Sequence, residues 1–230
     1  METVALEALV LKQTSEEVQR RFAGIDDLAH GWEHIQRVYT TALSLAEQEG
    51  ADRFVVGMAA LLHDLGRIAP QSSFDGTDGA DGTQARHHAD ISVELAQEIL
   101  DAFQVPVEKQ QAIIHAIVAH SFSRNIEPLT LEAGIVRDAD RLDGLGALGI
   151  IRWAVTGTQR RTPQTRTYDP EDPFAEHHTP DDKRYMLDHF YTKLFKLAGT
   201  MTTRTGRALA EQRTTFMRAY LDQLRKELEY

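Results

Sequence analysis

His63 and Asp64 occupy positions where an apolar helical pattern would otherwise place hydrophobic residues. They continue the apolar run that begins at Phe54, and a run of this length predicts a buried helix. A carboxylate buried without a partner is costly, so Asp64 requires a cation or strong hydrogen-bond donors. The two side chains can converge on one ion beside the helix, although for this pair alone ordinary hydrogen bonds that close a helix end would suffice.

Two further residues of the same types lie inside apolar helical patterns elsewhere. His34 lies on the side of a predicted helix that carries Val38, and Asp140 is flanked by apolar residues, where aspartate is a poor helix former. Two imidazoles and two carboxylates suit Mn²⁺, Fe²⁺, Co²⁺, Ni²⁺ or Zn²⁺. Four ligands from three helices would leave coordination positions for water and substrate, as a catalytic metal requires.

Helices must position these residues, because apolar residues recur at helical spacing and alternating strand patterns are nearly absent. We therefore predict an all-α fold, with Thr14-Ser15 and Asp52 as helix caps. The predicted helices lie at about residues 16–23, 32–49, 52–66, 89–103, from 107 onward, 131–155, 181–197 and 206–229. We expect a single domain over residues 1–230, with its core at about 30–155 and C-terminal helices at 181–229.

Two segments interrupt the helical pattern. Residues 70–87 are rich in glycine and predict a flexible loop. Residues 157–183 hold four of the seven prolines and are too long for a simple connection. Residues 151–168 carry four arginines and no acid, whereas residues 169–182 carry six acids and no lysine or arginine. This second segment is either a lid that presents guanidinium groups to a phosphate chain or a solvated excursion whose halves neutralise each other.

Composition excludes several classes of protein. The 230 residues carry a formal net charge of −10, which is unfavourable for binding duplex nucleic acid. The absence of cysteine excludes disulfides, thiolate zinc sites, iron–sulfur clusters and a cysteine nucleophile. The longest charge-free apolar run, residues 54–62, is too short to cross a membrane, and no secretory signal is evident. We expect a cytoplasmic protein.

The ordered set His34, His63-Asp64 and Asp140 resembles the H…HD…D signature of the HD-domain metal-dependent phosphohydrolases. Stretches such as Ala119-His-Ser-Phe-Ser123 and Tyr168-Asp-Pro-Glu-Asp-Pro-Phe-Ala175 also resemble a small single-domain bacterial subgroup. The resemblance implies a helical core and a divalent ion (Mn, Mg, Co, Ni, Fe or Zn) on those four residues. It also implies hydrolysis of a phosphoester or phosphoanhydride in a small phosphorylated substrate. Members like this one are associated with nucleotides, including nucleoside triphosphates cleaved to monophosphate and pyrophosphate.

Further residues receive candidate roles in such a reaction. Asp64 could accept a proton besides binding metal, and His120, which matches the family's His-Ser-Phe-Ser stretch, could contact the substrate or leaving group. Arginines near the phosphates would stabilise developing charge. The candidate phosphate contacts are Arg37, Arg141, Arg160 and Arg161, with Arg166 as a further lid arginine. For Arg141, a salt bridge with Asp138 or Asp143 is an equally good alternative.

Arg67 departs from the pattern of several HD branches, and His87, His88 and His115 each allow more than one role. Arg67 stands where those branches have a glutamate three residues after the Asp of the pair, so no general acid or base carries over there and guanosine tetraphosphate hydrolase or 5′-nucleotidase activity is disfavoured. His87 and His88 fit a surface loop or helix cap, with a second metal as the alternative. His115 fits a hydrogen-bonded core position.

Two other functions remain open at this stage. An HD-fold di-iron oxygenase would need His87 or His88 and another residue to bind a second iron. A non-catalytic nucleotide-binding or stress-sensing module would retain the fold without turnover, although all four expected ligands are present.

Overall fold

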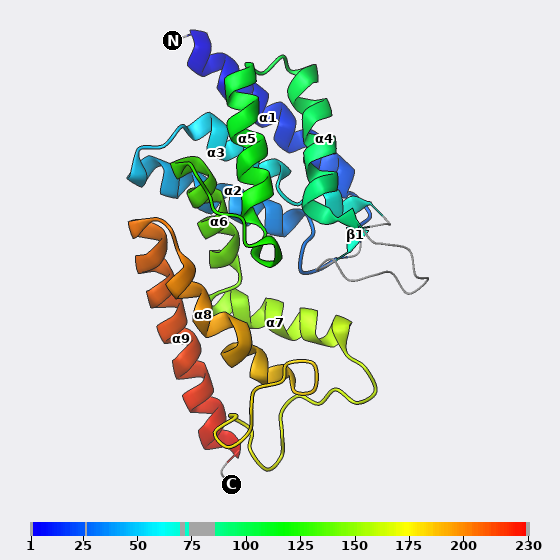
Figure 1. The fold of residues 1–230 in the computed structure, drawn as a ribbon, viewed down its shortest axis with the longest axis vertical. Helices are drawn as coiled ribbons and strands as arrows, with labels where there is room; N and C mark the ends of the chain where they lie inside the picture. Colours follow the sequence, from blue (N-terminus) through cyan, green and yellow to red (C-terminus); the bar gives the residue numbers. More distant parts are fainter. Residues whose placement is uncertain (1, 26, 70–71, 74–85, 229–230) are drawn as a thin grey trace. The chain divides into compact units, whose positions relative to one another are not determined.

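The computed structural model describes residues 2–25, 27–69, 72–73 and 86–228 (Figure 1). The all-α prediction is confirmed: in these ranges the only strands are β1 (Ser72–Ser73) and β2 (Arg86–His87), which form one short parallel pair. The predicted glycine-rich loop lies mostly outside the described residues. No helix in the described part of the chain is long and apolar enough to cross a membrane. Contacts divide the chain into two compact units, residues 1–140 and 141–230.

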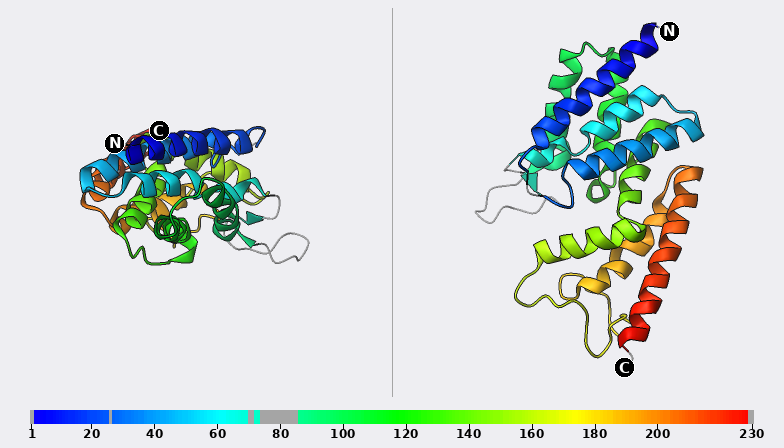
Figure 2. Two further views of the ribbon diagram at one scale, coloured as in Figure 1. Left: turned by 90° about the horizontal axis from the view of Figure 1, so that it is seen from above. Right: turned by 180° about the vertical axis from the view of Figure 1, so that it is seen from behind.

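The first unit is a helical bundle with α3 at its centre (Figures 1 and 2). In this unit α3 packs against α1, α2 and α5, and α4 packs against α5 and η1. Its elements are α1 (Glu2–Phe22), α2 (Trp32–Glu49), α3 (Arg53–Leu62), η1 (Leu65–Ile68), α4 (His88–Ala102), α5 (Val107–His120), η2 (Phe122–Arg124) and most of α6 (Leu131–Asp143).

Helix α3 delivers the His-Asp pair into the core. Asp52 caps the helix as predicted, because its side chain accepts hydrogen bonds from the backbone N–H groups of Phe54 (2.9 Å) and Val55 (3.1 Å). All residues from 54 to 66 are buried, which agrees with a helix that is apolar on every face. His63 and Asp64 therefore emerge from the end of α3 inside the protein.

The N-terminal helix is longer than predicted. We expected it to start after Thr14-Ser15, but α1 begins at Glu2. Thr14 is fully buried on the same face as Val10, Leu11 and Val18. The residue that resembles a helix cap is therefore part of the packed face of α1.

The predicted helix over residues 131–155 is wrong, because two helices occupy this region. Helix α6 ends at Asp143, and α7 runs from Gly146 to Arg160. Gly146 adopts a left-handed φ of 76°, which glycine tolerates readily. A Cβ at Gly149 would also lie only 2.3 Å from the backbone oxygen of Gly144. The glycines thus permit a sharp break, and Asp140 lies in the last turn of α6.

The second unit combines two long helices with an irregular segment. Helices α7 and α9 (Arg204–Leu228) pack together. The predicted helix over residues 181–197 begins only at residue 186 and consists of short turns of different types. These are η3 (Met186–Asp188), η4 (Phe190–Leu194), α8 (Phe195–Leu197) and η5 (Ala198–Thr200).

The segment that we expected to form a lid is internally organised by acidic side chains. Helix α7 extends to residue 160, so the irregular part begins later than predicted. Asp172 accepts hydrogen bonds from the backbone N–H groups of Glu176, His177 and His178 at 2.7–3.0 Å. The His178 ring lies between Asp172 Oδ2 (2.8 Å) and the buried Asp188 Oδ2 (2.9 Å). At least part of the acid excess therefore holds this segment together.

This double contact makes the stability of the wild-type protein pH dependent. The Asp188 and Asp172 carboxylates raise the pKa of His178. A raised pKa in the folded state contributes stability that is complete below the unfolded value of about 6.5 and is lost as pH rises through the folded value. We expect the stability advantage of wild type over His178→Gln, measured by urea unfolding, to shrink between pH 6 and pH 8. His177→Gln, at an exposed neighbour, is the control; a pH-independent advantage over His178→Gln would contradict the assignment.

Candidate metal centre

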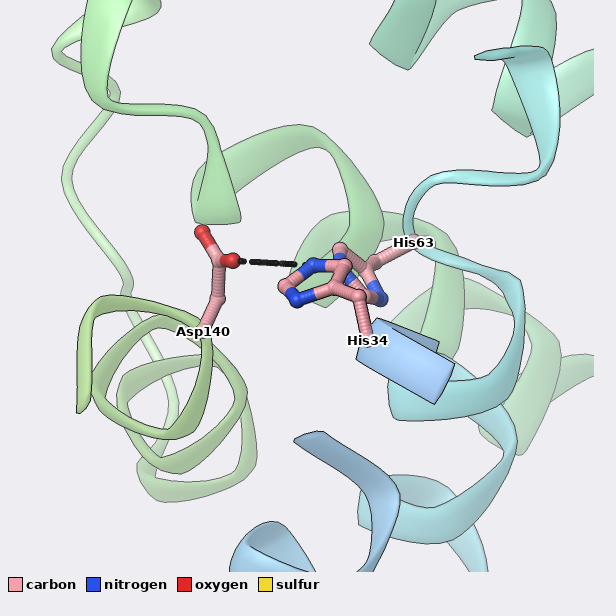
Figure 3. Close-up of side chains that lie close together, drawn as sticks. All are labelled: His34, His63 and Asp140. Atoms are coloured by element: carbon pink, nitrogen blue, oxygen red, sulfur yellow. Dashed lines mark hydrogen bonds and ion pairs between the residues drawn. The ribbon is translucent and has the colours of Figure 1, made fainter. Parts of the chain in front are cut away.

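Side chains from three helices meet at the end of α3 (Figure 3). His34 comes from α2, His63 from the C-terminal end of α3 and Asp140 from α6. His34 Nε2 lies 3.3 Å from His63 Nε2 and 3.4 Å from Asp140 Oδ1. Asp64 Oδ2 lies 3.7 Å from His34 Nε2 and 3.8 Å from His63 Nε2. The four residues proposed from sequence as metal ligands are thus brought together.

The spacing of these four atoms suits a cation. Nitrogen and oxygen ligands about 2.1 Å from one ion lie about 3 to 3.5 Å from each other. The observed separations run from 3.3 to 4.0 Å, so the set is slightly wider than one closed around an ion; His34, His63 and Asp140 form one compact group, and Asp64 lies in a second with His63 and His120. A single His34 Nε2 proton could not satisfy His63 Nε2 at 3.3 Å and Asp140 Oδ1 at 3.4 Å at once. The arrangement therefore fits a divalent metal better than a closed hydrogen-bond network.

Backbone carbonyl groups fix the orientation of two of the rings. His63 Nδ1 lies 2.8 Å from Ala60 O, and His120 Nδ1 lies 2.6 Å from Ile117 O. A carbonyl only accepts, so each Nδ1 carries the proton and donates it. In the neutral ring this leaves the Nε2 lone pair directed into the site, as in metal-binding histidines.

A second group of ligand atoms surrounds the other oxygen of Asp64. His88 Nε2 lies 3.3 Å and His120 Nε2 3.6 Å from Asp64 Oδ1. All three side chains are at most 3% exposed. Neither ring nitrogen of His88 nor Asp64 Oδ1 has a hydrogen-bond partner among the described residues. Buried polar atoms without partners are costly, and a cation between them would remove that cost.

The expectation for the two adjacent histidines was therefore half right. His87 caps α4, since its Nδ1 accepts a hydrogen bond of 3.1 Å from the backbone N–H of Ala89. His88 is not on the surface but 2% exposed inside the cluster. His115 is half-buried and accepts a hydrogen bond from the backbone N–H of Leu129, outside the cluster.

Gly66 explains how His88 reaches Asp64. A Cβ at this position would lie 2.1 Å from His88 O and 2.7 Å from Ser92 N, so only glycine allows η1 to approach the start of α4 this closely. The backbone N–H of Gly66 also donates to Ser92 Oγ at 2.8 Å. The glycine two residues after Asp64 permits this close approach, but by itself it does not identify His88.

Burial and neighbouring charges favour the ligand forms that bind metal. Burial lowers the pKa of His63 to about 4 and that of His88 to about 2. Burial opposes the charge on Asp64, but Arg67 and His63 hold the pKa of that carboxyl well below its usual range. Burial likewise opposes the charge on Asp140, and His34 beside it lowers its pKa. His120 is the exception, because Asp64 raises its pKa against the effect of burial and so favours the protonated ring, which cannot bind a metal.

The arginines predicted to contact phosphate differ in their burial and in their hydrogen-bond partners. Arg37 is half-buried on α2, one turn after His34. Arg141 is 8% exposed, and its Nη1 donates to Thr200 O at 2.9 Å. Arg161 is exposed directly after α7, whereas the side chain of Arg160 lies outside the described atoms.

The fold and the cluster define an all-helical domain with a His/Asp set that could hold a divalent metal. The chain belongs to the HD domain family, whose model matches residues 31–145. Bacillus subtilis YpgQ is 32% identical over 203 residues, covering 86% of this chain and 84% of YpgQ. A crystal structure of YpgQ in complex with ADP matches with 31% identity and a TM-score of 0.70 over 96% of each chain.

Two further similarities differ in extent. A crystal structure of an HD-superfamily hydrolase from Bacillus thuringiensis is 30% identical, with a TM-score of 0.71 over 97% of this chain and 98% of that chain. Ribonuclease Y from Treponema denticola is 29% identical over 110 residues, which cover 48% of this chain and 18% of that protein. The similarity to ribonuclease Y is thus partial, whereas the similarity to the hydrolase spans nearly the whole chain.

The second ligand group predicts a metal stoichiometry. We expect the wild type to bind two Mn²⁺ ions per chain and His88→Ala to bind one, because only the group around Asp64 Oδ1 loses a ligand. Equilibrium dialysis with elemental analysis measures both values. The control His115→Ala should keep the wild-type stoichiometry. Two ions bound by His88→Ala would contradict the assignment of His88 as a ligand.

Proposed function

We propose that this protein is a metal-dependent phosphohydrolase that cleaves a phosphoanhydride bond of a nucleotide, with nucleoside triphosphates cleaved to monophosphate and pyrophosphate as the leading reaction. The observation that carries the proposal is the convergence of His34, His63, Asp64 and Asp140, whose carboxylate oxygens lie within 4.0 Å of both histidine Nε2 atoms. The similarity to the HD-superfamily hydrolase of Bacillus thuringiensis supports the reaction class. The ADP complex of YpgQ supports a nucleotide ligand.

In this proposal the chain contributes ligands, orientation and proton handling. His34, His63, Asp64 and Asp140 would hold the ion. A divalent ion there supplies Lewis acidity towards a phosphoryl oxygen and lowers the pKa of bound water. Asp64 is also the proposed proton acceptor, at a carboxylate oxygen whose basicity is weakened because Arg67 and His63 lower the pKa of the group. When the group around Asp64 Oδ1 holds no ion, His120 Nε2, which faces that oxygen, is the proposed contact to the substrate or leaving group; with a second ion bound there, the same atom would be a ligand instead.

Cationic side chains complete the proposed substrate site. Phosphoryl transfer depends mainly on positioning and charge stabilisation, so guanidinium groups near the phosphates lower the barrier. Arg37 follows His34 by one helical turn and is the proposed contact from α2. Arg160 and Arg161 are proposed to bind the polyphosphate tail. Arg141 keeps this proposed role through the guanidinium atoms other than the Nη1 that donates to Thr200 O.

The second ligand group favours one alternative reaction class. A di-iron oxygenase on this scaffold needs a second iron, which His88 and His120 could bind together with Asp64. Two irons per chain as isolated, with oxygen consumption and no nucleotide hydrolysis, would favour that alternative. A non-catalytic nucleotide-binding module would bind nucleotide with no turnover in Mn²⁺, Mg²⁺ or Co²⁺.

A metal-supplemented hydrolysis screen with products identified by mass tests the proposed reaction, and Asp64→Asn tests the site. We expect Asp64→Asn to lose bound metal and to lower kcat/KM by at least about 100-fold, because a ligand that serves both groups is removed. Circular dichroism should show nearly unchanged helix content. Asp222→Asn, the same change at an exposed position of α9, should retain activity. Full activity of Asp64→Asn would refute the metal-site assignment.

The lid arginines can be tested by their discrimination between substrates. Replacing Arg160, Arg161 and Arg166 together by glutamine should raise KM for a triphosphate by about 10-fold or more, because charge-assisted hydrogen bonds to the outer phosphates are lost. KM for a monophosphate ester should change much less. Arg204→Gln, at an exposed position of α9, controls for the loss of surface charge. Equal effects on both substrates would rule out a polyphosphate clamp.

A further inference from the structure

Arg67 binds Asp64 Oδ2, the carboxylate oxygen that faces His34 and His63. Its Nε donates to Asp64 Oδ2 at 2.6 Å, and that oxygen lies 3.7 Å from His34 Nε2 and 3.8 Å from His63 Nε2. The Asp64 side chain is 3% exposed and that of Arg67 14% exposed, so little water screens the ion pair. The guanidinium charge therefore lies against an atom that the proposed metal would use.

The backbone of η1 holds Arg67 in this place. The backbone N–H of Arg67 donates to Asp64 O at 2.9 Å, which closes the turn between the two residues. The backbone N–H of Gly66 donates to Ser92 Oγ of α4, which ties the same turn to the bundle. The arginine is thus presented to Asp64 by a fixed turn.

We propose that Arg67 is a resident counter-cation of the metal centre, which compensates the buried Asp64 charge when no metal is bound and weakens metal binding in return. This inference rests on the metal site of the proposed function. Without metal, the ion pair spares Asp64 the cost of an uncompensated buried charge. With metal, the ion and the Arg67 guanidinium share one carboxylate in a poorly screened site. The repulsion between these two cations lowers the affinity for the ion.

A purely positioning role for Arg67 predicts the opposite change in metal affinity. Groups that hydrogen-bond to metal ligands usually orient them, and their loss weakens metal binding by about 10- to 100-fold. Here Asp64 is already held by burial, and the rings of His63 and His120 are oriented by backbone carbonyls. Electrostatic repulsion is therefore the larger effect of Arg67, and its removal should strengthen metal binding.

The experiment compares wild type, Arg67→Gln and Arg67→Lys in two measurements without substrate. We expect Arg67→Gln to lower the Tm of the metal-free protein by about 5 °C or more and to tighten the Kd for Mn²⁺ in calorimetry by about 10-fold or more. Arg67→Lys keeps a positive charge, so its values should lie closer to wild type in both measurements. Arg20→Gln removes an arginine paired with Glu17 on α1, a helix that carries no proposed ligand, and should leave the Mn²⁺ affinity unchanged.

The outcomes separate this inference from the proposed reaction. An unchanged or weaker Mn²⁺ affinity in Arg67→Gln overturns the counter-cation role, and so does a wild type that binds no Mn²⁺. If Arg67→Gln fails to fold, an Arg67→Lys affinity below wild type overturns the proposal and one equal to or above wild type supports it. Absence of nucleotide hydrolysis with the predicted changes in affinity and Tm would overturn the proposed reaction alone.

Discussion

The charge of Asp64, buried at the end of an apolar helix, is the constraint on which the centre of this protein depends. Water cannot stabilise this carboxylate at 2% exposure, so its neighbours must supply positive charge or hydrogen-bond donors. The surrounding groups divide between its two oxygens: His34, His63 and Arg67 face Oδ2, whereas His88 and His120 face Oδ1. The helices packed around α3 bring these groups to one carboxylate.

The helix backbone also organises the site beyond carrying its side chains. Carbonyl groups three residues before His63 and His120 accept hydrogen bonds from Nδ1 of the two rings. Each ring is therefore held both by its covalent attachment to the helix and by this hydrogen bond. Rings fixed in this way lose little freedom when they bind a ligand, and their bonding atoms are already directed inward. A centre with such preformed donors requires little rearrangement of the bundle when an ion binds.

Much of this architecture follows from local sequence patterns, and the errors have identifiable causes. His63 and Asp64 stood out because charged and polar groups rarely continue a long apolar run, and the helical class followed from the spacing of apolar residues. Thr14 was misread because a small polar residue can serve as a cap or fill a tight interface. The break at Gly146 needs a left-handed backbone that apolar periodicity does not report. His88 was undervalued because its burial depends on contacts between segments distant in sequence.

The close approach at Gly66 has a consequence for recognising and designing related sites. A side chain at this position would collide with the backbone of α4, so a larger residue would force that helix away from Asp64. The glycine therefore sets how many histidines can gather around one aspartate, although it carries no functional group itself. In a sequence search, a small residue at this point combined with a histidine at the start of the next helix would distinguish chains built for two ligand groups from chains built for one. In a designed helical bundle, the same glycine would be the first residue to fix, before any ligand is placed.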